Sequence, residues 1–144
     1  MIRGHCLLES CAHALKAETM DRFKPEGWST VTPRLFTSDV EGLVGFLKAA
    51  FDAEGEVKQG RPAEIRIGDS IVMVSDGGGV RQSASAFLHL YVPDADETYR
   101  RAIAAGAQAI EAVADMPYGD RRAMVRDRWG NSWQIATHRG RQPA

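Results

Sequence analysis

The sequence predicts an α+β fold made of two copies of one βαβββ module. Hydrophobic patterns in the order strand, helix and three strands occur twice along the 144 residues. Asp39 and Asp94, which stand at the starts of the two predicted helices, are 55 residues apart. A linker rich in Gly and Ser, 76–85, separates the copies, which span about 29–75 and 86–138.

The first copy begins with a predicted strand at 29–37, which is rich in β-branched and aromatic residues. Pro33 indicates a strand start or a sheet edge, because proline cannot donate a ladder hydrogen bond. Ser38 and Glu41 are spaced as a capping box at the start of a helix. The apolar stripe of that helix is Val40, Leu43, Val44, Leu47 and Phe51. Three further strands are predicted at 54–58, 63–67 and 70–75.

The second copy repeats this order after the linker. A strand is predicted at 86–92, and Asp94 with Glu97 forms a second capping box. Gly106 is well placed to end the helix, since glycine tolerates the left-handed backbone conformation found there. The apolar stripe of this helix is Ala95, Tyr99, Ala102 and Ile103. The remaining strands are predicted at 108–114, 121–127 and 131–138.

Residues 1–23 are predicted to be an extension outside the domain, which we place at 24–144. A short helix is expected over 5–22, and a chain that starts at Met20 should keep its stability. The extension contains four potential zinc ligands, His5, Cys6, Cys11 and His13. They could bind zinc only if the segment folded around the ion, so a non-essential extension is the favoured interpretation.

Composition excludes two classes of partner. The 18 Lys and Arg residues balance 19 Asp and Glu residues, so the formal net charge is −1 and gives no electrostatic footprint for nucleic acid. No apolar run reaches the roughly 18 residues of a membrane span, and we expect a soluble, cytoplasmic protein. No Gly-Lys-Ser/Thr follows the glycines of the linker, which favours a flexible connector over a phosphate cradle.

Several short segments resemble a known family in their order and spacing. They are Ala63-Glu64-Ile65-Arg66-Ile67-Gly68-Asp69-Ser70, Leu90-Tyr91-Val92-Pro93-Asp94, Tyr118-Gly119-Asp120-Arg121, Val125-Arg126-Asp127 and Gly130-Asn131-Ser132-Trp133. Over about 24–138 the chain resembles the glyoxalase/bleomycin-resistance/dioxygenase superfamily, whose fold is also called vicinal oxygen chelate. Within it, the chain is most similar to the phosphonate-operon-type, glyoxalase-like branch.

The resemblance implies that the two modules form a curved mixed sheet around a cleft, with the helices outside. It also implies a homodimer. Strand alternation supports the cleft independently, because neighbouring residues of a strand point to opposite faces. In the strand at 86–92, Leu88, Leu90 and Val92 should lie under a helix, which leaves Phe87, His89 and Tyr91 on the concave face.

Metal-dependent members of the family hold a divalent ion with four His or Glu side chains. The resemblance places the equivalent positions at Thr32, Met73, Phe87 and Gln134, none of which is a strong ligand for a divalent ion. We therefore expect no metal and no cofactor. A shift of two residues would put His89 in place of Phe87 and bring Glu64 nearby, which would restore a metal site.

The candidate ligand-binding residues on the concave face are Arg34, Phe36, Phe87, His89, Tyr91 and Gln134. Aromatic side chains supply flat apolar area, and the polar ones supply anchors for an anionic or carbonyl group. Arg34 could instead pair with Glu64, and His89 could be a satisfied core histidine. Asp120 and Arg121 could reach the cleft mouth or form a salt bridge in a turn.

Two functions remain open at this point. The first is a small-molecule binding or sequestering protein without a metal. The alternative is an enzyme that resembles a glyoxalase, dioxygenase or epimerase, with a displaced metal or with metal-free acid–base chemistry around His89 and Glu64.

Overall fold

The computed structural model describes residues 23–77 and 84–140. The expected helix over 5–22, the four potential zinc ligands and most of the linker lie outside the described residues. The chain divides into two compact units, Met1–Thr32 and Pro33–Ala144. In the described part of the first unit, the amide of Trp28 donates to the carbonyl oxygen of Pro25 over 3.2 Å. Neither helix of the described chain is long and apolar enough to cross a membrane.

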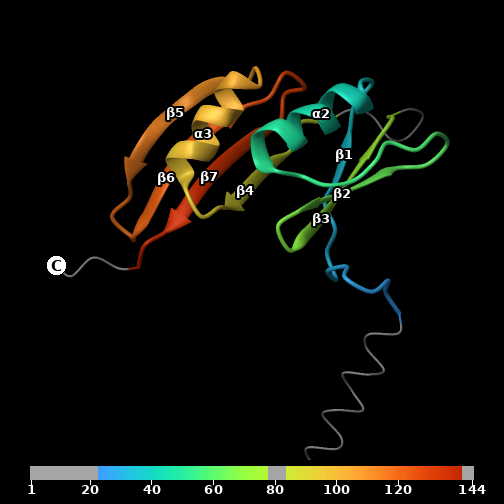
Figure 1. Ribbon diagram of the computed structural model, residues 1–144, viewed down its shortest axis with the longest axis horizontal. Helices are drawn as coiled ribbons and strands as arrows, with labels where there is room; N and C mark the ends of the chain where they lie inside the picture. Colours follow the sequence, from blue (N-terminus) through green and yellow to red (C-terminus); the bar gives the residue numbers. More distant parts are fainter. Residues whose placement is uncertain (1–22, 78–83, 141–144) are drawn as a thin grey trace, which may run out of the picture. The chain divides into compact units, whose positions relative to one another are not determined.

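The unit from residue 33 onward contains the predicted repeat (Figure 1). The elements of the first copy are β1 (Arg34–Phe36), α2 (Val40–Phe51), β2 (Ala63–Ile67) and β3 (Ser70–Ser75). Those of the second copy are β4 (Phe87–Tyr91), α3 (Ala95–Ala104), β5 (Gln108–Asp115), β6 (Asp120–Arg126) and β7 (Ser132–His138). The α+β class and the duplicated strand–helix order are confirmed.

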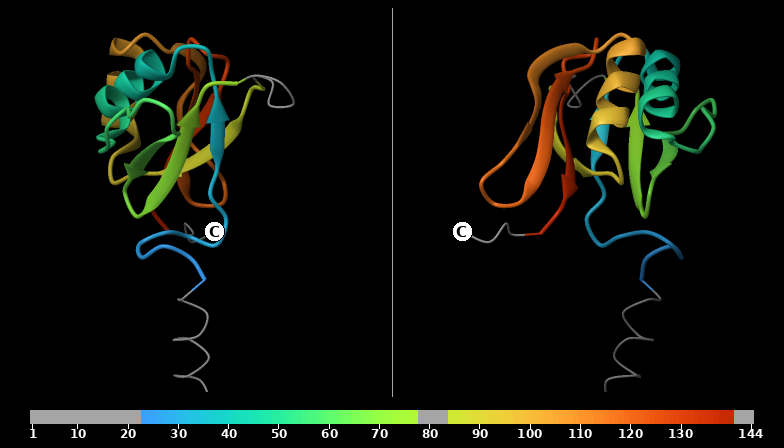
Figure 2. Two further views of the ribbon diagram at one scale, coloured as in Figure 1. Left: turned by 90° about the vertical axis from the view of Figure 1, so that its right-hand side faces the viewer. Right: turned by 60° about the vertical axis from the view of Figure 1, so that its left-hand side comes forward.

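The strands form two mixed sheets with corresponding orders. In the first, β1 pairs in parallel with β3, and β3 pairs antiparallel with β2. In the second, β4 pairs in parallel with β7, followed by antiparallel β6 and β5. The helices α2 and α3 pack beside each other, as Figure 2 shows in its right-hand view. The first sheet therefore repeats the second without a counterpart of β5.

The prediction of a strand at 54–58 is wrong. Only Glu54 pairs with the sheet, through two backbone hydrogen bonds of 2.8 and 2.9 Å to Arg66. Gly55 then has a φ of 140°, and a Cβ at this position would clash with the carbonyl oxygen of Glu64. This conformation turns the chain out of the ladder, so the following residues form a loop at 57–62.

The first strand and the first helix cap also differ from the prediction. Strand β1 covers three residues instead of the segment 29–37. The N-cap of α2 is Asp39 and not Ser38, because the Asp39 carboxylate accepts the amide of Gly42 over 3.1 Å. The second cap is as predicted, since the Asp94 carboxylate accepts the amide of Glu97 over 3.2 Å. Aspartate caps therefore begin both helices.

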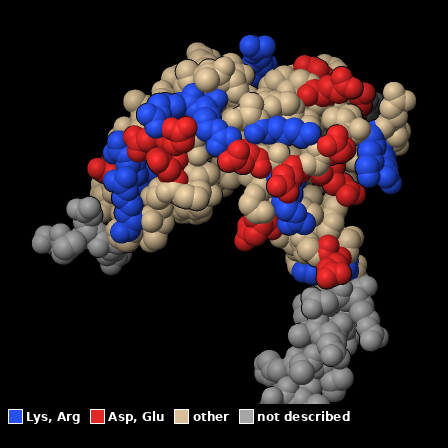
Figure 3. Space-filling view, viewed as in Figure 1, with Lys and Arg blue, Asp and Glu red and all other residues tan. Residues whose placement is uncertain are grey.

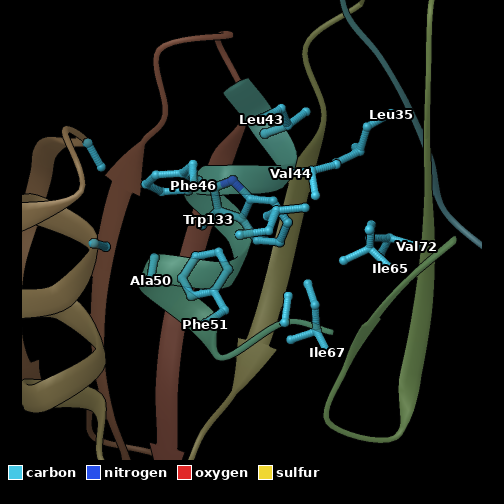
Figure 4. Close-up of a cluster of buried hydrophobic side chains, with 14 of the residues drawn as sticks. Leu35, Leu43, Val44, Phe46, Ala50, Phe51, Ile65, Ile67, Val72 and Trp133 are labelled. Atoms are coloured by element: carbon cyan, nitrogen blue, oxygen red, sulfur yellow. The ribbon is translucent and has the colours of Figure 1, made fainter. Parts of the chain in front are cut away.

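The two modules share one hydrophobic core. Trp133 of β7 is buried beneath α2, where its ring lies 4.9 Å from that of Phe51 (Figure 4). Phe46 of the same helix packs against Trp129, which follows β6, with 6.1 Å between the ring centroids. Arg101 of α3 donates to the Asp52 carboxylate at the end of α2 over 2.9 Å. Helix α2 thus packs on both modules.

The turn between β6 and β7 is organised by the buried carboxylate of Asp127. It accepts hydrogen bonds from the amides of Trp129 and Asn131 and from the indole of Trp133, each over 2.9 Å. The side-chain oxygen of Asn131 accepts the amide of Ala86 over 3.0 Å. The turn therefore fixes the start of β4 beside β7, where the predicted site residues begin.

Candidate functional site

One face of the four-stranded sheet is packed against the core, and the opposite face is open. On β4, Leu88 and Leu90 pack against the core, whereas Phe87 and Tyr91 are each 63% exposed. We call the exposed side of β4, β7 and β6 the open face. This alternation agrees with the prediction from the strand pattern.

His89 and Gln134 form the middle row of the open face. They lie opposite each other in the parallel ladder between β4 and β7, and the His89 Nδ1 is 2.9 Å from the Gln134 Oε1. Because a carbonyl oxygen only accepts, Nδ1 is the donor in this pair. The His89 ring also packs edge-on against Tyr91, with 4.7 Å between centroids. The imidazole therefore has a fixed orientation.

A second row contains a buried carboxylate between two exposed side chains. Asp120 at the start of β6 is 4% exposed, and its Oδ1 accepts His138 Nδ1 over 2.7 Å. Its Oδ2 accepts the Tyr91 hydroxyl over 3.4 Å. The pKa of the Tyr91 phenol is raised, mainly by the negative charge of Asp120. The His138 side chain is 63% exposed, so its Nε2 is accessible.

Arg122 adds a cation to this face. It lies opposite Ala136 of β7 and donates to the Tyr118 hydroxyl over 3.0 Å and to Glu111 over 3.1 Å. Its Nε is buried, and no partner for this atom occurs within the described part of the chain. The sequence analysis missed Tyr118, Glu111 and Arg122 as site residues. The alternation of β6 would have placed Arg122 on this face, had the register with β7 been known.

The open face continues into a cleft between the modules, which we call the intermodule cleft. Its volume is about 510 Å³, and it lies between the turn of the β2–β3 hairpin and the end of β4. His89 and Tyr91 line it from β4. Charged side chains from the first module line it as well, namely Asp52, Glu54, Arg66 and Asp69. The cleft thus combines an aromatic wall with polar anchors.

Three of the six predicted ligand-binding residues line a cavity, and those three do not share one. His89 and Tyr91 line the intermodule cleft, whereas Arg34 lines a second cavity of about 670 Å³ in the first module. Arg34 donates to the Ser75 hydroxyl over 2.9 Å, and its guanidinium lies 5.2 Å from the centroid of the Phe36 ring. Phe36, Phe87 and Gln134 line neither cavity.

The charged candidates have different partners in the structure. Among the described residues Arg34 bonds Ser75 and makes no ion pair with Glu64. Arg121 lies on the helix side of β6, where it binds the carboxylate of Asp96 over 2.7 Å. Asp120 points instead to the open face, so these neighbours have separate roles.

The residues opposite each other in the two parallel ladders differ from the metal positions that the resemblance implied. Met73 lies opposite Arg34 in the ladder of β1 and β3, and Gln134 lies opposite His89 in the ladder of β4 and β7. The resemblance implied Thr32 and Phe87 instead, each of which is two residues earlier in the chain. No group of three or more His, Cys, Asp or Glu side chains suited to a metal ion occurs at residues 23–77 or 84–140. Over the face seen in Figure 3, charges of both signs are interspersed.

Comparisons with known proteins find the same family over most of the chain. Residues 29–135 match the Glyoxalase/Bleomycin resistance protein/Dioxygenase superfamily. An uncharacterized protein of Mycobacterium bovis, Mb0911c, is 30% identical over 125 residues, which cover 73% of this chain and 80% of that protein.

Two solved structures are similar in fold. TioX from Micromonospora sp. ML1 has a TM-score of 0.67 and 28% identity, over 76% of this chain and 98% of TioX. TnmS3 from Streptomyces sp. CB03234, described as an antibiotic binding protein, has a TM-score of 0.64 and 22% identity. That match covers 76% of this chain and 96% of TnmS3.

Proposed function

Because the chain belongs to the Glyoxalase/Bleomycin resistance protein/Dioxygenase superfamily, we propose that it binds small molecules at the open face and the intermodule cleft. The observation that carries this proposal is the pair His89 and Tyr91, which line the cleft with a fixed imidazole and an exposed phenol ring. TnmS3, a protein of the same fold described as antibiotic binding, supports a binding role in general.

The lining favours a partly aromatic ligand that carries an anionic or carbonyl group. Phe87 and Tyr91 offer exposed rings on one face of β4, on either side of His89, and rings of this kind stack on flat apolar groups. Arg66 on the opposite wall and the accessible Nε2 of His89 are suited to bind oxygen or nitrogen atoms of the ligand.

We further propose that binding needs no resident divalent metal ion. At the four facing ladder positions, Arg34 brings a positive charge and Met73 a weak thioether donor. His89 and Gln134 are the only nitrogen or oxygen donors suited to a metal among those four, and they are bonded to each other. This donor set does not fit a divalent ion, which requires several anionic or imidazole ligands.

A thermal-shift screen of aromatic acids and carbonyl compounds, followed by calorimetry, tests the binding proposal. His89→Ala should weaken the binding of a ligand found in this way by about 2- to 10-fold, as expected for the loss of one hydrogen bond. Arg100→Gln is the control, because Arg100 is exposed on α3 and, among the described residues, pairs with Glu97. Equal affinity of His89→Ala and Arg100→Gln would refute the proposed site.

Metal dependence is tested by the same calorimetry. Ligand affinity should be unchanged after treatment with a chelator and after addition of zinc, nickel or manganese. A ligand that binds only in the presence of one of these ions would overturn the metal-free proposal and leave the location of the site intact.

A second candidate function is acid–base catalysis on the open face. The buried Asp120 holds His138 with Nε2 free, and the same carboxylate accepts the Tyr91 hydroxyl. A carboxylate-oriented imidazole is a suitable general base, and the neighbouring guanidinium of Arg122 could stabilise an oxyanion. The reaction class is removal of a proton next to a carbonyl group.

Proton NMR in D₂O tests this second function on the carbonyl ligands from the screen. Deuterium exchange next to the carbonyl should be accelerated by the wild-type protein. Asp120→Asn and His138→Gln should each slow exchange at least tenfold while ligand affinity remains. Exchange rates that do not differ between wild type and His138→Gln would leave binding as the function.

A further inference from the structure

A cavity in the first module, with a volume of about 670 Å³, is distinct from the intermodule cleft, and the two have no lining residue in common. It lies where β1 leads into α2, and its other wall is the loop at 57–62. In chain order this loop, between α2 and β2, corresponds to strand β5 of the second module, between α3 and β6. We call the space the loop cavity.

Three cationic side chains line the loop cavity: Arg34 from β1 and Lys58 and Arg61 from the loop. None of them lies within 4.0 Å of a carboxylate in the described portion of the chain. By contrast, most of the described arginines of the second module pair with a carboxylate, for example Arg101 with Asp52 and Arg121 with Asp96. The charge of these three cations is therefore available to a ligand.

Arg34 is held in place before any ligand arrives. Its Nε donates to Ser75, which is only 8% exposed, and its guanidinium contacts the Phe36 ring. These contacts use Nε and one flat face, so the two terminal nitrogens remain as a fork. A fork of this kind binds two oxygens of a phosphate or carboxylate at little further entropic cost.

Three acidic side chains also line the loop cavity and oppose an anion. Both oxygens of Asp39 are engaged, one by the amide of Gly42 and the other by the indole of Trp129. Glu41 and Asp76 stand on the wall with no partner in the described ranges. Removal of the Glu41 charge should therefore strengthen the binding of an anion, whereas removal of a cation should weaken it.

From this arrangement we propose that the loop cavity is a second binding site, which holds a small molecule by a phosphate or carboxylate group. Arg34 provides the fixed fork, and Lys58 and Arg61 close around the anion from the loop. The cavity volume leaves room for the remainder of a small organic ligand beside the anionic group.

Backbone NMR titrations of the full chain with inorganic phosphate and with acetate, at constant ionic strength, test the proposal. Saturable shifts are expected at the amides of Gly60 and Ser75. Arg61→Gln and Lys58→Gln should each raise the dissociation constant of the preferred anion about 3- to 10-fold. Glu41→Gln should lower it about 2- to 3-fold.

Lys48→Gln is the matched control, because it removes the same charge from a lysine that pairs with Glu56 outside the loop cavity. Its affinity should equal that of the wild type. The proposal would be overturned by shifts that do not saturate, or by an equal loss of anion affinity in Lys48→Gln and Arg61→Gln. Either result would show that net charge alone causes the effect. Shifts confined to His89 and Tyr91 would move the anion to the intermodule cleft and also overturn it.

Discussion

Two buried aspartates show how one residue type can serve the fold or the surface. Asp127 receives all its hydrogen bonds from its own turn and from Trp133 just beyond it. Asp120 instead binds Tyr91 and His138, two exposed side chains that come from different strands. The first carboxylate stabilises a turn, whereas the second organises groups that a ligand can reach.

Asp127→Asn should lower the free energy of unfolding by about 2–4 kcal/mol, because an amide cannot accept the same set of donors and leaves buried N–H groups unsatisfied. Urea unfolding followed by tryptophan fluorescence measures the change. Asp69→Asn, at an exposed position in the β2–β3 turn, should stay within about 0.5 kcal/mol. Equal stability of the two variants would contradict the role assigned to Asp127.

The Tyr91 phenol should titrate above its ordinary pKa of 10.0, because ionisation places a second negative charge beside Asp120. The folded state then favours the neutral phenol. This contribution to stability is present below the ordinary pKa and is lost as the pH rises through the raised pKa.

Ultraviolet titration of tyrosinate, with Tyr91→Phe as the reference for subtraction, measures this pKa. Asp120→Asn should lower it toward the ordinary value, and Asp69→Asn should leave it unchanged. A Tyr91 pKa that does not respond to Asp120→Asn would show that the two groups do not interact.

At the scale of elements, α2 is tied to the second module at both ends. Its N-cap, Asp39, accepts the amide of Gly42 and the Trp129 indole, each over 3.1 Å. At its other end, Asp52 has a left-handed backbone conformation and pairs with Arg101 of α3. Both caps of α2 therefore also connect the two modules. The carboxylate of Asp94, the N-cap of α3, makes no such connection among the described residues.

Asp39→Ala should be more destabilising than Asp94→Ala. Loss of a helix cap costs about 1 kcal/mol, and Asp39→Ala also leaves the Trp129 indole without its acceptor. Thermal and urea unfolding of both variants measure the difference. In a Trp129→Phe background the two alanine variants should become similar, and a difference that persists there would rule out the indole as its source.

At the scale of the whole molecule, the shared core leaves the open face uncovered in the unit from residue 33 onward. Phe87 and Tyr91 are each 63% exposed, and Tyr118 is 51% exposed. Exposed aromatic side chains gathered on one sheet face are typical of surfaces that bind a partner or a ligand. Strands β4 and β5 are also the edges of their sheet.

The protein should form a homodimer that covers part of this surface. Light scattering at micromolar concentration should give about twice the 15.8 kDa of one chain. Phe87→Ser should shift the mass toward the monomer, while Ile103→Ser, an exposed apolar position on α3, should not. A wild-type mass of one chain would refute the dimer.

The repeat could be predicted because helical and strand periodicities are local properties of the sequence. The stripe from Leu43 to Phe51 is buried as predicted, and β4 alternates as predicted. The incorrect prediction of a strand at 54–58 depended on the backbone at Gly55, which lies so near Glu64 that a Cβ would clash with the Glu64 carbonyl oxygen. No pattern within one strand could show this contact.

The candidate site was harder to predict than the fold. Which residues share a cavity depends on how the two sheets and α2 are placed. The sequence alone therefore could not show that Arg34 and His89 line different cavities. In the parallel ladders, the residues that face Met73 and Gln134 are also two positions later in the chain than Thr32 and Phe87. The phosphonate-operon-type branch, the dimer and the cellular location stay predictions.

The absence of a β5 counterpart in the described part of the first module bears on how this protein could be engineered. Residues in a ladder are constrained by their neighbours, whereas the loop at 57–62 contributes side chains to a cavity wall and pairs with no strand. Libraries randomised over residues 57–61 should therefore yield many folded variants with altered ligand selectivity. The duplicated architecture thus supplies a rigid frame in one copy and a variable segment for directed evolution in the other.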